Sequence, residues 1–505
     1  MLTLIVFIPL VAAFALLFVK ENNRSLIRRV SLGAAGVSFL LSLGLLATFD
    51  KTNPGMQFEC AVSWIPLLNI QYHVGIDGIS LLLLVLTAFL SGIAICYSLK
   101  QEKGLRNFLA LMLALEAGTL GVFVALDTIL FYVFWELMLV PTYFLIGIWG
   151  EGRRVYATTK FVIFTLVGSL LMLVAIVGVT VVHYQATGVM TFDIQTLVHT
   201  HFDPASQLWM FLCFFLAFAI KVPVFPFHSW LPHTYIACPT PTLIILTGAM
   251  SKTGAYGFLR FCLPLFPDTV TDLGPVIGAA AATGIVYGAW IAVAQKDLKA
   301  LVAYSSISHL GFITLGIFAL NNVGVEGSVL QMVNHGIIAA ALFLIVDILE
   351  EKTGTRNLKD FRGLGKSMPI LYGTFMLITL AALGLPGLNG FVGEFLILMG
   401  VWTSHLLSNF SAIFVLMAGL AIVFASIYML YMFQGSMQEI NPNDSKELKD
   451  INRTEFGLLL PACVLIVFIG LFPKPFIDRI SPSVESLLTV EKIVNVHAGE
   501  DKAHH

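Results

Sequence analysis

Residues 218–260 read FAIKVPVFPFHSWLPHTYIACPTPTLIILTGAMSKTGAYGFLR and place a proline-rich break between two apolar runs. Each apolar run carries one lysine, Lys221 before the break and Lys252 after it. The prolines of the break are Pro223, Pro226, Pro232, Pro239 and Pro241. Proline ends or kinks a helix, and a broken helix in hydrocarbon is tolerated only where neighbours or water satisfy its freed carbonyls. Because a charge in such a segment is costly, the stretch predicts an ion site near the middle of a membrane.

The composition of the whole chain is typical of a multi-pass membrane protein. Of its 505 residues, 58% are hydrophobic and 11% are charged, and the mean hydropathy is +0.89, whereas soluble proteins carry about 25% charged residues. The net charge of −2 gives no support for nucleic-acid binding. The cysteines form no CxxC pair, and no phosphate-binding or dinucleotide-binding motif is present. We therefore expect no cofactor and no metal in this chain, although His228, His233 and Cys238 leave a zinc site open as an alternative.

The apolar runs predict an all-α fold of about fourteen transmembrane helices, each long enough for the roughly 20 residues that cross a bilayer. The predicted spans are approximately 2–19, 30–48, 77–98, 106–125, 128–148, 156–183, 206–222, 240–262, 273–294, 300–320, 325–349, 369–386, 406–434 and 455–472. The first run is expected to be a retained helix, because its positive charges follow it and do not precede it as in a signal peptide. A polar connection at 185–201 is expected to hold a short surface helix. A tail at 475–505 is expected to be partly helical, with His504 and His505 solvated or a tag remnant.

Positive charges gather in every second loop. They are Lys20, Arg24, Arg28, Arg29, Lys100, Lys103, Arg106, Arg153, Arg154, Lys296, Lys299, Lys352, Arg356, Lys359, Arg362, Lys366, Lys446, Lys449 and Arg453. The other loops hold only Lys51 before the tail. The positive-inside rule places the first set in the cytoplasm, so both termini are expected outside.

The chain also contains a weak internal repeat. An N-terminal three-helix segment (1–105) would precede two five-helix units (106–262 and 273–434), and a last helix with the tail (435–505) would follow. In each unit the fourth helix is broken, by KVPVFPFHSWLP in the first and LGLPGLNGFVGEF in the second. Because five is an odd number of crossings, the two units would be inverted, and broken helices at matching positions of inverted repeats mark transport sites.

Seven ionisable residues lie inside the predicted spans. They are Glu116, Glu136, Lys221, Lys252, His309, His335 and Glu394. At a rise of about 1.5 Å per residue they fall near one depth, which predicts a polar line parallel to the membrane plane. A carboxylate near a buried lysine keeps it charged, so Glu136 is expected to hold Lys221 protonated and to release its proton when the two separate. Histidine suits such a relay because it titrates near neutral pH.

Structural roles are the alternative for several polar residues. Two interpretations stay open for three histidines: a role in a proton relay, or a hydrogen bond that stabilises a helix. They are His309 and His335, each beside polar neighbours, and His228 beside the break. Asp77 and Asp127 stand at span edges and are expected to be helix caps. Arg260 stands at a helix end and is expected to extend its guanidinium to the membrane surface.

Long motifs spread over nearly the whole chain resemble one family. The motifs are FYVFWELMLVPTYFLIGIWG (131–150), YATTKF (156–161), AIKVPVFPFHSWLP (219–232), SKTGAYGFLRF (251–261), QKDLKALVAYSSISHLGF (295–312) and GLPGLNGFVGEF (384–395). They are similar to the antiporter-like M subunits of the proton-pumping NADH:quinone oxidoreductases, respiratory complex I. The resemblance implies fourteen helices with two inverted five-helix repeats and no redox centre. It also implies that the Glu136–Lys221 pair, the central Lys252, His309 and His335, and Glu394 in the exit half-channel carry the protons.

One segment departs from the family. Where the family usually reads LPDAHxEAPT, this chain continues from Pro232 as HTYIACPT, so two acids and a histidine are replaced. Proton uptake into the first half is therefore expected to use His228, His233 or Tyr235. The family's arginine near 432–435 is also missing.

The resemblance implies a proton-translocating, non-redox membrane subunit of an NADH (or ferredoxin):quinone oxidoreductase in a bacterial inner membrane. Its expected partners are L-like and N-like antiporter subunits, small membrane subunits, the lipid bilayer and protons. Two alternatives stay open. The chain could instead belong to a multi-subunit Na⁺/H⁺ antiporter or a membrane-bound hydrogenase, or be a paralogue coupled to CO₂ hydration, which only the altered 233–238 segment supports.

Overall fold

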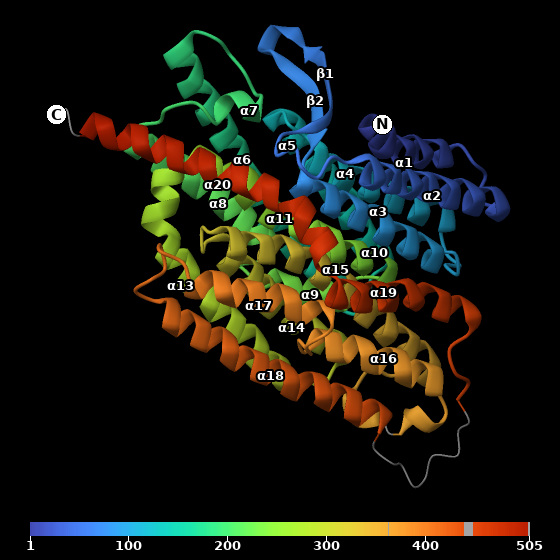
Figure 1. The fold of residues 1–505 in the computed structure, drawn as a ribbon. Helices are drawn as coiled ribbons and strands as arrows, with labels where there is room; N and C mark the ends of the chain where they lie inside the picture. Colours follow the sequence, from blue (N-terminus) through green and yellow to red (C-terminus); the bar gives the residue numbers. More distant parts are fainter. Residues whose placement is uncertain (362, 439–447, 503–505) are drawn as a thin grey trace.

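The computed structural model describes residues 1–361, 363–438 and 448–502 as a bundle of long helices with one small β-hairpin (Figure 1). Within these residues, eleven helices are long and apolar enough to cross a membrane, and three shorter apolar helices join them. The predicted all-α, multi-pass fold is confirmed, whereas the exact count of fourteen spans and the inversion of the repeats stay predictions. Arg362, Lys446, His504 and His505, named above, lie outside the described residues.

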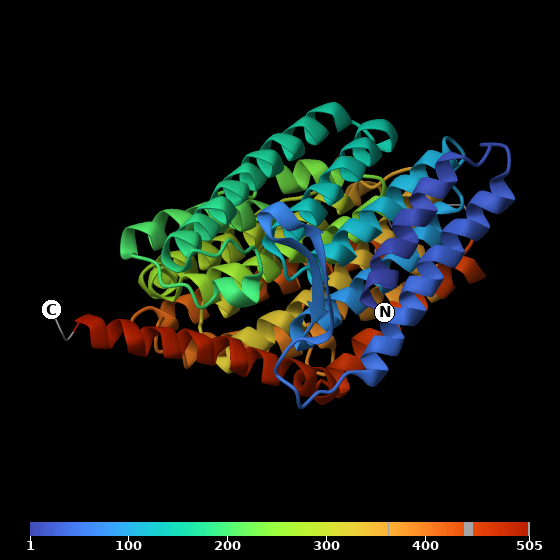
Figure 2. The same ribbon diagram turned by 90° about the horizontal axis from the view of Figure 1, so that it is seen from above.

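The N-terminal part contains a feature that was not predicted, a hairpin between the second and third helices. The elements are α1 (Leu2–Leu17), α2 (Arg24–Thr48), β1 (Gln57–Ile65), η1 (Pro66–Leu68), β2 (Ile70–Ile76) and α3 (Gly78–Ser98). The two strands pair antiparallel. The Asn69 side chain donates to the Met190 carbonyl at 2.9 Å, which ties the hairpin turn to a distant loop. The hairpin lies across one end of the bundle together with α7 (Figure 2), and we name this end the hairpin face.

The part of the chain predicted to be the first unit contains the break that the opening motif predicts. Its elements are α4 (Leu105–Val124), α5 (Thr128–Trp149), α6 (Arg154–Thr187), α7 (Ile194–Leu197), α8 (Pro204–Lys221), α9 (Trp230–Ala237), α10 (Thr240–Ile245), η2 (Leu246–Met250), α11 (Lys252–Gly257), η3 (Phe258–Cys262) and α12 (Leu263–Leu265). The elements η2 and η3 are π-helical. The span predicted at 240–262 is therefore one helical column with two widened turns.

The part of the chain predicted to be the second unit contains the second break. Its elements are α13 (Pro267–Val293), α14 (Leu298–Ile317), α15 (Asn322–Thr353), η4 (Leu358–Asp360), η5 (Leu364–Lys366), α16 (Pro369–Ala382), α17 (Asn389–Trp402) and α18 (Ser411–Met437). Helices α14 and α15 are almost entirely buried and form the centre of the bundle. Helix α17 packs closely on α15, where a Cβ added to Gly400 would lie 2.3 Å from the Gly324 Cα. Such close approach of helices through glycine is a common way to pack in membranes, and it holds α17 against the centre.

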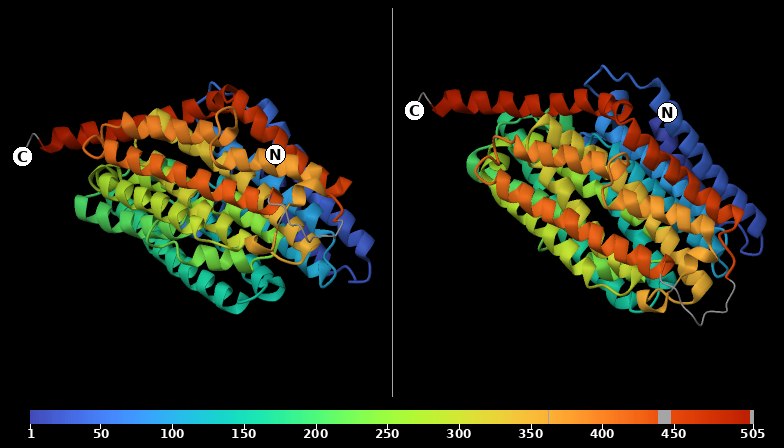
Figure 3. Two further views of the ribbon diagram at one scale, coloured as in Figure 1. Left: turned by 90° about the horizontal axis from the view of Figure 1, so that it is seen from below. Right: turned by 60° about the horizontal axis from the view of Figure 1, so that its bottom comes forward.

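The C-terminal part is α19 (Arg453–Leu471) followed by α20 (Lys474–Lys502). The described part of the tail, which was predicted to be partly helical, is thus one long helix. It packs on α3, α12, α13 and α15 and runs along the outside of the bundle (Figure 3).

Candidate functional site

The first break keeps its backbone hydrogen bonds satisfied through a side chain. Helix α8 ends at Lys221, and α9 begins at Trp230. The indole Nε1 of Trp230 donates to the Ile220 carbonyl at 2.8 Å, a carbonyl that the proline-containing segment leaves without a helical partner. The break is therefore stable, and it places Lys221 at the negative end of the α8 dipole, which favours a cation.

Lys221 lies among aromatic rings and not beside a carboxylate. Its side chain is buried, with 2% of the residue exposed. Its Nζ lies 5.1 Å from the Trp135 ring centroid and 5.9 Å from that of Phe161, so the ammonium faces two π systems. Within the part of the chain that the structure describes, no direct ion pair joins Lys221 to Glu136, and Glu136 Oε1 is buried without a hydrogen-bond partner. Glu136 nevertheless lies near enough for its charge to act on Lys221, so the two form a pair without direct contact. We name Lys221, Trp135, Phe161 and Glu136 together the Lys221 site.

Lys252 is positioned by the π-helical turn that precedes it. The Ser251 amide donates to the Leu246 carbonyl at 3.1 Å, five residues back, as a π-helix requires. The Lys252 Nζ donates to the Thr247 carbonyl at 2.5 Å and to His335 Nδ1 at 2.8 Å. The widened turn therefore frees a carbonyl for the ammonium and directs it at a histidine on α15.

Two histidines and a glutamate continue the contacts away from Lys252. The His335 and His309 ring centroids are 5.4 Å apart. His309 Nδ1 lies 2.9 Å from Glu394 Oε1, which also accepts from Gln331 Nε2 at 3.3 Å. A small enclosed cavity of about 10 Å³ touches both rings, Gln331 and Glu394. Lys252, His335, His309 and Glu394 thus form a line of contacts across the centre of the bundle, which we name the contact chain.

The second break is satisfied mainly by its own backbone. The amides of Leu383, Gly384 and Leu385 donate to the last carbonyls of α16. Where α17 begins, the Asn334 side chain on α15 also donates to the Asn389 carbonyl at 2.7 Å. Helix α17 therefore starts next to α15, and Glu394 in its second turn faces His309 on α14. Sequence reasoning did not single out Gln331 or Asn334 as site residues, although both are amides inside an apolar run, which is itself a signal.

The remaining predicted site residues do not join the contact chain. Both carboxylate oxygens of Glu116 are fully buried without a partner. Tyr235 is buried, and its hydroxyl has no hydrogen-bond partner within the described residues.

The two histidines at the first break lie apart. His228 packs between Phe225 and Tyr287, with ring centroids at 5.4 and 4.7 Å. His233 is exposed beside Tyr156, whereas Cys238 is buried. Across the residues that the structure describes, no three metal-ligating side chains converge, so the alternative zinc set is not assembled.

Two predictions about span edges have different outcomes. Asp77 caps α3 and Asp127 caps α5, as predicted, each through two backbone amides. The prediction that Arg260 extends to the membrane surface is wrong. Its Nη2 lies 2.7 Å from Asp77 Oδ2, and its Nε donates to the Tyr256 hydroxyl at 3.1 Å. The guanidinium turns inward because this carboxylate, distant in sequence, lies within reach.

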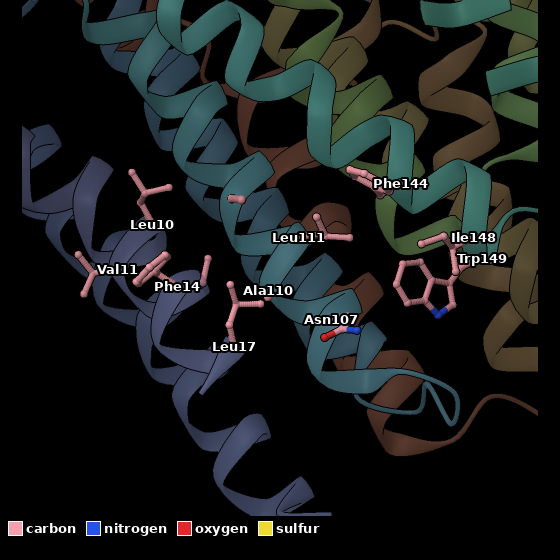
Figure 4. A pocket seen from close by; sticks show the side chains of 12 residues that line it. Leu10, Val11, Phe14, Leu17, Asn107, Ala110, Leu111, Phe144, Ile148 and Trp149 are labelled. Carbon is pink, nitrogen blue, oxygen red and sulfur yellow. The ribbon is translucent and has the colours of Figure 1, made fainter. Parts of the chain in front are cut away.

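A large apolar groove lies apart from these residues. It has a volume of about 790 Å³ and runs between α1, α4 and α5 (Figure 4). Apart from Asn107, the residues that line it are apolar or aromatic, among them Phe14, Phe144 and Trp149. Such a lining suits lipid chains and offers no group that transfers protons.

Comparison with known proteins gives one consistent family. A family model described as "NADH:quinone oxidoreductase/Mrp antiporter, TM" matches residues 125–421. A protein of Rhodobacter capsulatus named "NADH-quinone oxidoreductase subunit M" is 38% identical, over 99% of this chain and 97% of its own length.

Two solved structures share the fold. A chain of respiratory complex I from Thermus thermophilus, solved with bound NADH, superposes with a TM-score of 0.88 at 32% identity, over 97% of this chain and all of that chain. A chain of the Mrp complex from Dietzia sp. superposes with a TM-score of 0.85 at 21% identity, over 96% of this chain and 97% of that chain. At that identity the second likeness concerns the fold alone.

Proposed function

The chain belongs to the family of NADH:quinone oxidoreductase/Mrp antiporter membrane subunits, and from this premise we propose that it moves protons across a bacterial inner membrane as a subunit of an NADH:quinone oxidoreductase. The identity of 38% to a subunit of that oxidoreductase, against 21% to the Mrp chain, favours this function over Na⁺/H⁺ antiport. Its partners would be the other membrane subunits, among them L-like and N-like antiporter subunits and small membrane subunits.

The single observation that carries the proposal is the contact chain. It places four titratable groups in sequence, with 2.8 Å between Lys252 Nζ and His335 Nδ1 and 2.9 Å between His309 Nδ1 and Glu394 Oε1. Groups at these distances transfer protons directly. No bulk water reaches them, because each of the four residues is at most 8% exposed.

The hydrogen-bond partners indicate which ring nitrogen of each histidine carries the proton, and this arrangement lets a proton pass through both rings. Lys252 donates to His335 Nδ1, so the neutral His335 carries its proton on Nε2. His309 donates from Nδ1 to the Glu394 carboxylate, so its Nε2 is free to accept. A proton that arrives at His335 Nδ1 therefore releases another from Nε2, and the same exchange in the opposite order takes place on His309.

The gap between the two rings has room for one water molecule. The enclosed cavity of about 10 Å³ that touches both rings is close to the smallest volume that holds a water. A water there would accept from His335 Nε2 and donate to His309 Nε2. The proton would then reach Glu394 and leave Lys252 neutral, which completes one transfer with every proton accounted for.

We propose that this chain carries no redox centre and that electron transfer takes place on partner subunits. The sequence contains no CxxC pair and no phosphate-binding or dinucleotide-binding motif, which supports this assignment. The N-terminus would lie outside, because the loops rich in lysine and arginine would face the cytoplasm. His228 or His233 would contribute to proton uptake in the first half, and the tightly packed His228 is the better placed of the two.

The test is proton pumping by the assembled complex in inside-out membrane vesicles, recorded beside NADH oxidation. Glu394→Gln keeps a hydrogen-bond acceptor for His309 but no longer takes up a proton, so we expect pumping to fall by about tenfold or more. Glu394→Asp should fall less. Glu326→Gln, a half-buried acid on α15 outside the contact chain, is the matched control. Full pumping in assembled Glu394→Gln complex would overturn the proposal.

A further inference from the structure

A cavity on the hairpin face is lined in part by Asp77 and Arg260. It has a volume of about 210 Å³. The loop 54–56, the α7 region, α12 and α20 contribute most of its wall. Polar side chains that line it include Asp77, Gln195, His199, Arg260, Ser483 and Ser486. The rest of the wall is apolar, with Met56, Ile194 and Leu487 among its residues. We name this cavity the vestibule; unlike the apolar groove of Figure 4, it carries charged and polar side chains on one part of its wall.

The wall that α20 provides is fixed in place. The Gly78 amide donates to Ser483 Oγ at 2.9 Å. A Cβ added to Gly78 would lie 1.7 Å from the Arg479 carbonyl oxygen, so α20 lies directly on the first residue of α3. The vestibule consequently has a defined inner end, where Asp77 and Arg260 meet.

Arg260 closes this inner end as half of a buried ion pair. The side chains of Arg260 and Asp77 are 12% and 4% exposed, and their closest atoms, Nη2 and Oδ2, are 2.7 Å apart. The other oxygen of Asp77, Oδ1, accepts from the Ile79 and Ser80 amides at 3.1 and 2.9 Å. The carboxylate is therefore held rigidly, and it holds the guanidinium in turn.

Tyr256 lies between Arg260 and the contact chain. Lys252, Tyr256 and Arg260 follow each other at intervals of four residues along α11 and η3. The Tyr256 hydroxyl accepts from Arg260 Nε and lies 3.3 Å from the Phe123 carbonyl, to which it donates. Along the helix, the distance from Arg260 to Lys252 is about 12 Å, at about 1.5 Å per residue.

We propose that Arg260, fixed by Asp77, is a cationic plug that keeps protons in the vestibule from returning through Tyr256 to Lys252. The plug rests on the proposed function, because it protects a proton line. It adds an assignment to that function: the first half has an access route from the hairpin face that must stay closed while the contact chain transfers protons.

The chemistry of arginine suits a plug and excludes a relay. The guanidinium does not lose its proton in proteins, so it cannot pass one on. A fixed positive charge in a narrow polar passage repels hydronium, as an arginine does in pores that conduct water but not protons. A hydroxyl such as that of Tyr256 would pass protons if the charge in front of it were removed.

The test is passive proton leak, measured without NADH in proteoliposomes of the assembled complex under an imposed K⁺ diffusion potential. Arg260→Gln should raise the leak on the order of tenfold, whereas Arg260→Lys, which keeps the charge, should stay close to the unmodified complex. Arg260→Gln leaves the buried Asp77 carboxylate unpaired, which destabilises the fold. The double variant Asp77→Asn/Arg260→Gln removes both charges and avoids this destabilisation. It should leak as well.

A substitution that interrupts the proposed proton route distinguishes a leak along this route from a leak caused by a damaged fold. Lys252→Met added to the double variant should return the leak to the level of the unmodified complex, because the proposed route passes through Lys252. The plug would be overturned if the double variant leaked no more protons than the unmodified complex, or if its leak persisted after Lys252→Met was added. These outcomes are independent of pumping, so failure of the plug and failure of the proposed function are distinguishable.

Discussion

The contact chain and the Lys221 site use the same residue types in opposite arrangements. In the contact chain, a lysine, two histidines and a glutamate approach one another with 2.8 and 2.9 Å contacts at its two ends. At the Lys221 site, the lysine faces Trp135 and Phe161, and the glutamate has an unpartnered oxygen. The first arrangement joins its titratable groups by direct contacts, whereas in the second the cation and the carboxylate interact through their charges without touching. The difference teaches that the two halves of this chain couple the same residue types in different ways.

The largest effect is expected at Lys252, where the contact chain begins. Lys252→Met removes the donor to His335 and should reduce pumping by about a hundredfold, to the background of the assay. Lys299→Met is the matched control, since Lys299 is an equally buried lysine whose Nζ donates to the Cys238 carbonyl at 3.3 Å and lies outside the contact chain. Comparable loss in both variants would show that a buried lysine is needed for assembly and not for transfer. NADH oxidation and subunit content of the membranes are measured in parallel.

Glu136→Gln tests whether the Lys221 site acts through charge alone. Because Glu136 makes no direct contact with Lys221 in this state, its loss should reduce pumping by about fivefold, less than Glu394→Gln does. The same vesicle assay applies to both variants. A loss in Glu136→Gln that equals the loss in Glu394→Gln would remove the distinction between the two arrangements.

Trp135→Leu examines the aromatic contact of Lys221. A cation–π interaction contributes about 0.5–1 kcal/mol, so loss of the ring should lower the pumping rate by about twofold to fivefold. Trp135→Phe retains a weaker π face, so its pumping rate should lie between those of the unmodified complex and Trp135→Leu. If the Leu and Phe variants pump alike, the ring of Trp135 only fills space.

The smallest effect concerns the hairpin, outside the membrane-spanning helices. The hydrogen bond that His73 donates to Asp193, and the second that it donates to Glu59, raise the pKa of His73 against the opposing effect of burial. The stability that the charged His73 gives to the hairpin is therefore complete below about pH 6.5 and is lost as the pH rises through the raised value.

Hydrogen exchange of the hairpin amides measures this effect. We expect the protection factors of residues 70–76 to fall by about threefold between pH 6 and pH 9, and His73→Gln to remove the dependence. Equal protection at both pH values in the unmodified protein would contradict the assigned role of His73.

The sequence was enough to find the titratable residues but not their order of contact. Lys252, His309, His335 and Glu394 stand out because each is a costly group inside an apolar run. Their contacts depend on how α11, α14, α15 and α17 pack, and nothing in a single sequence specifies that packing. The same reason explains the misassigned Arg260, whose partner Asp77 belongs to a distant span.

Two local features were also missed, for different physical reasons. The hairpin at 57–76 has the alternating pattern and the Asn69 turn that signal two strands, so its omission was avoidable. The π-helical turns leave no such mark, because one extra residue per turn hardly changes the apolar pattern of a fully buried helix.

The π-helical turn at Leu246–Met250 also sets the angular phase of everything that follows it in the helix. One residue of an α-helix corresponds to a rotation of about 100°. A π-helical turn takes up its extra residue within the turn, and the helix beyond it continues in phase. If the same residues formed an ordinary α-helix instead, Lys252 would be rotated by about that angle, away from His335, and Tyr256 and Arg260 would rotate with it. The widened turn is therefore as much a part of the site as the identity of the lysine.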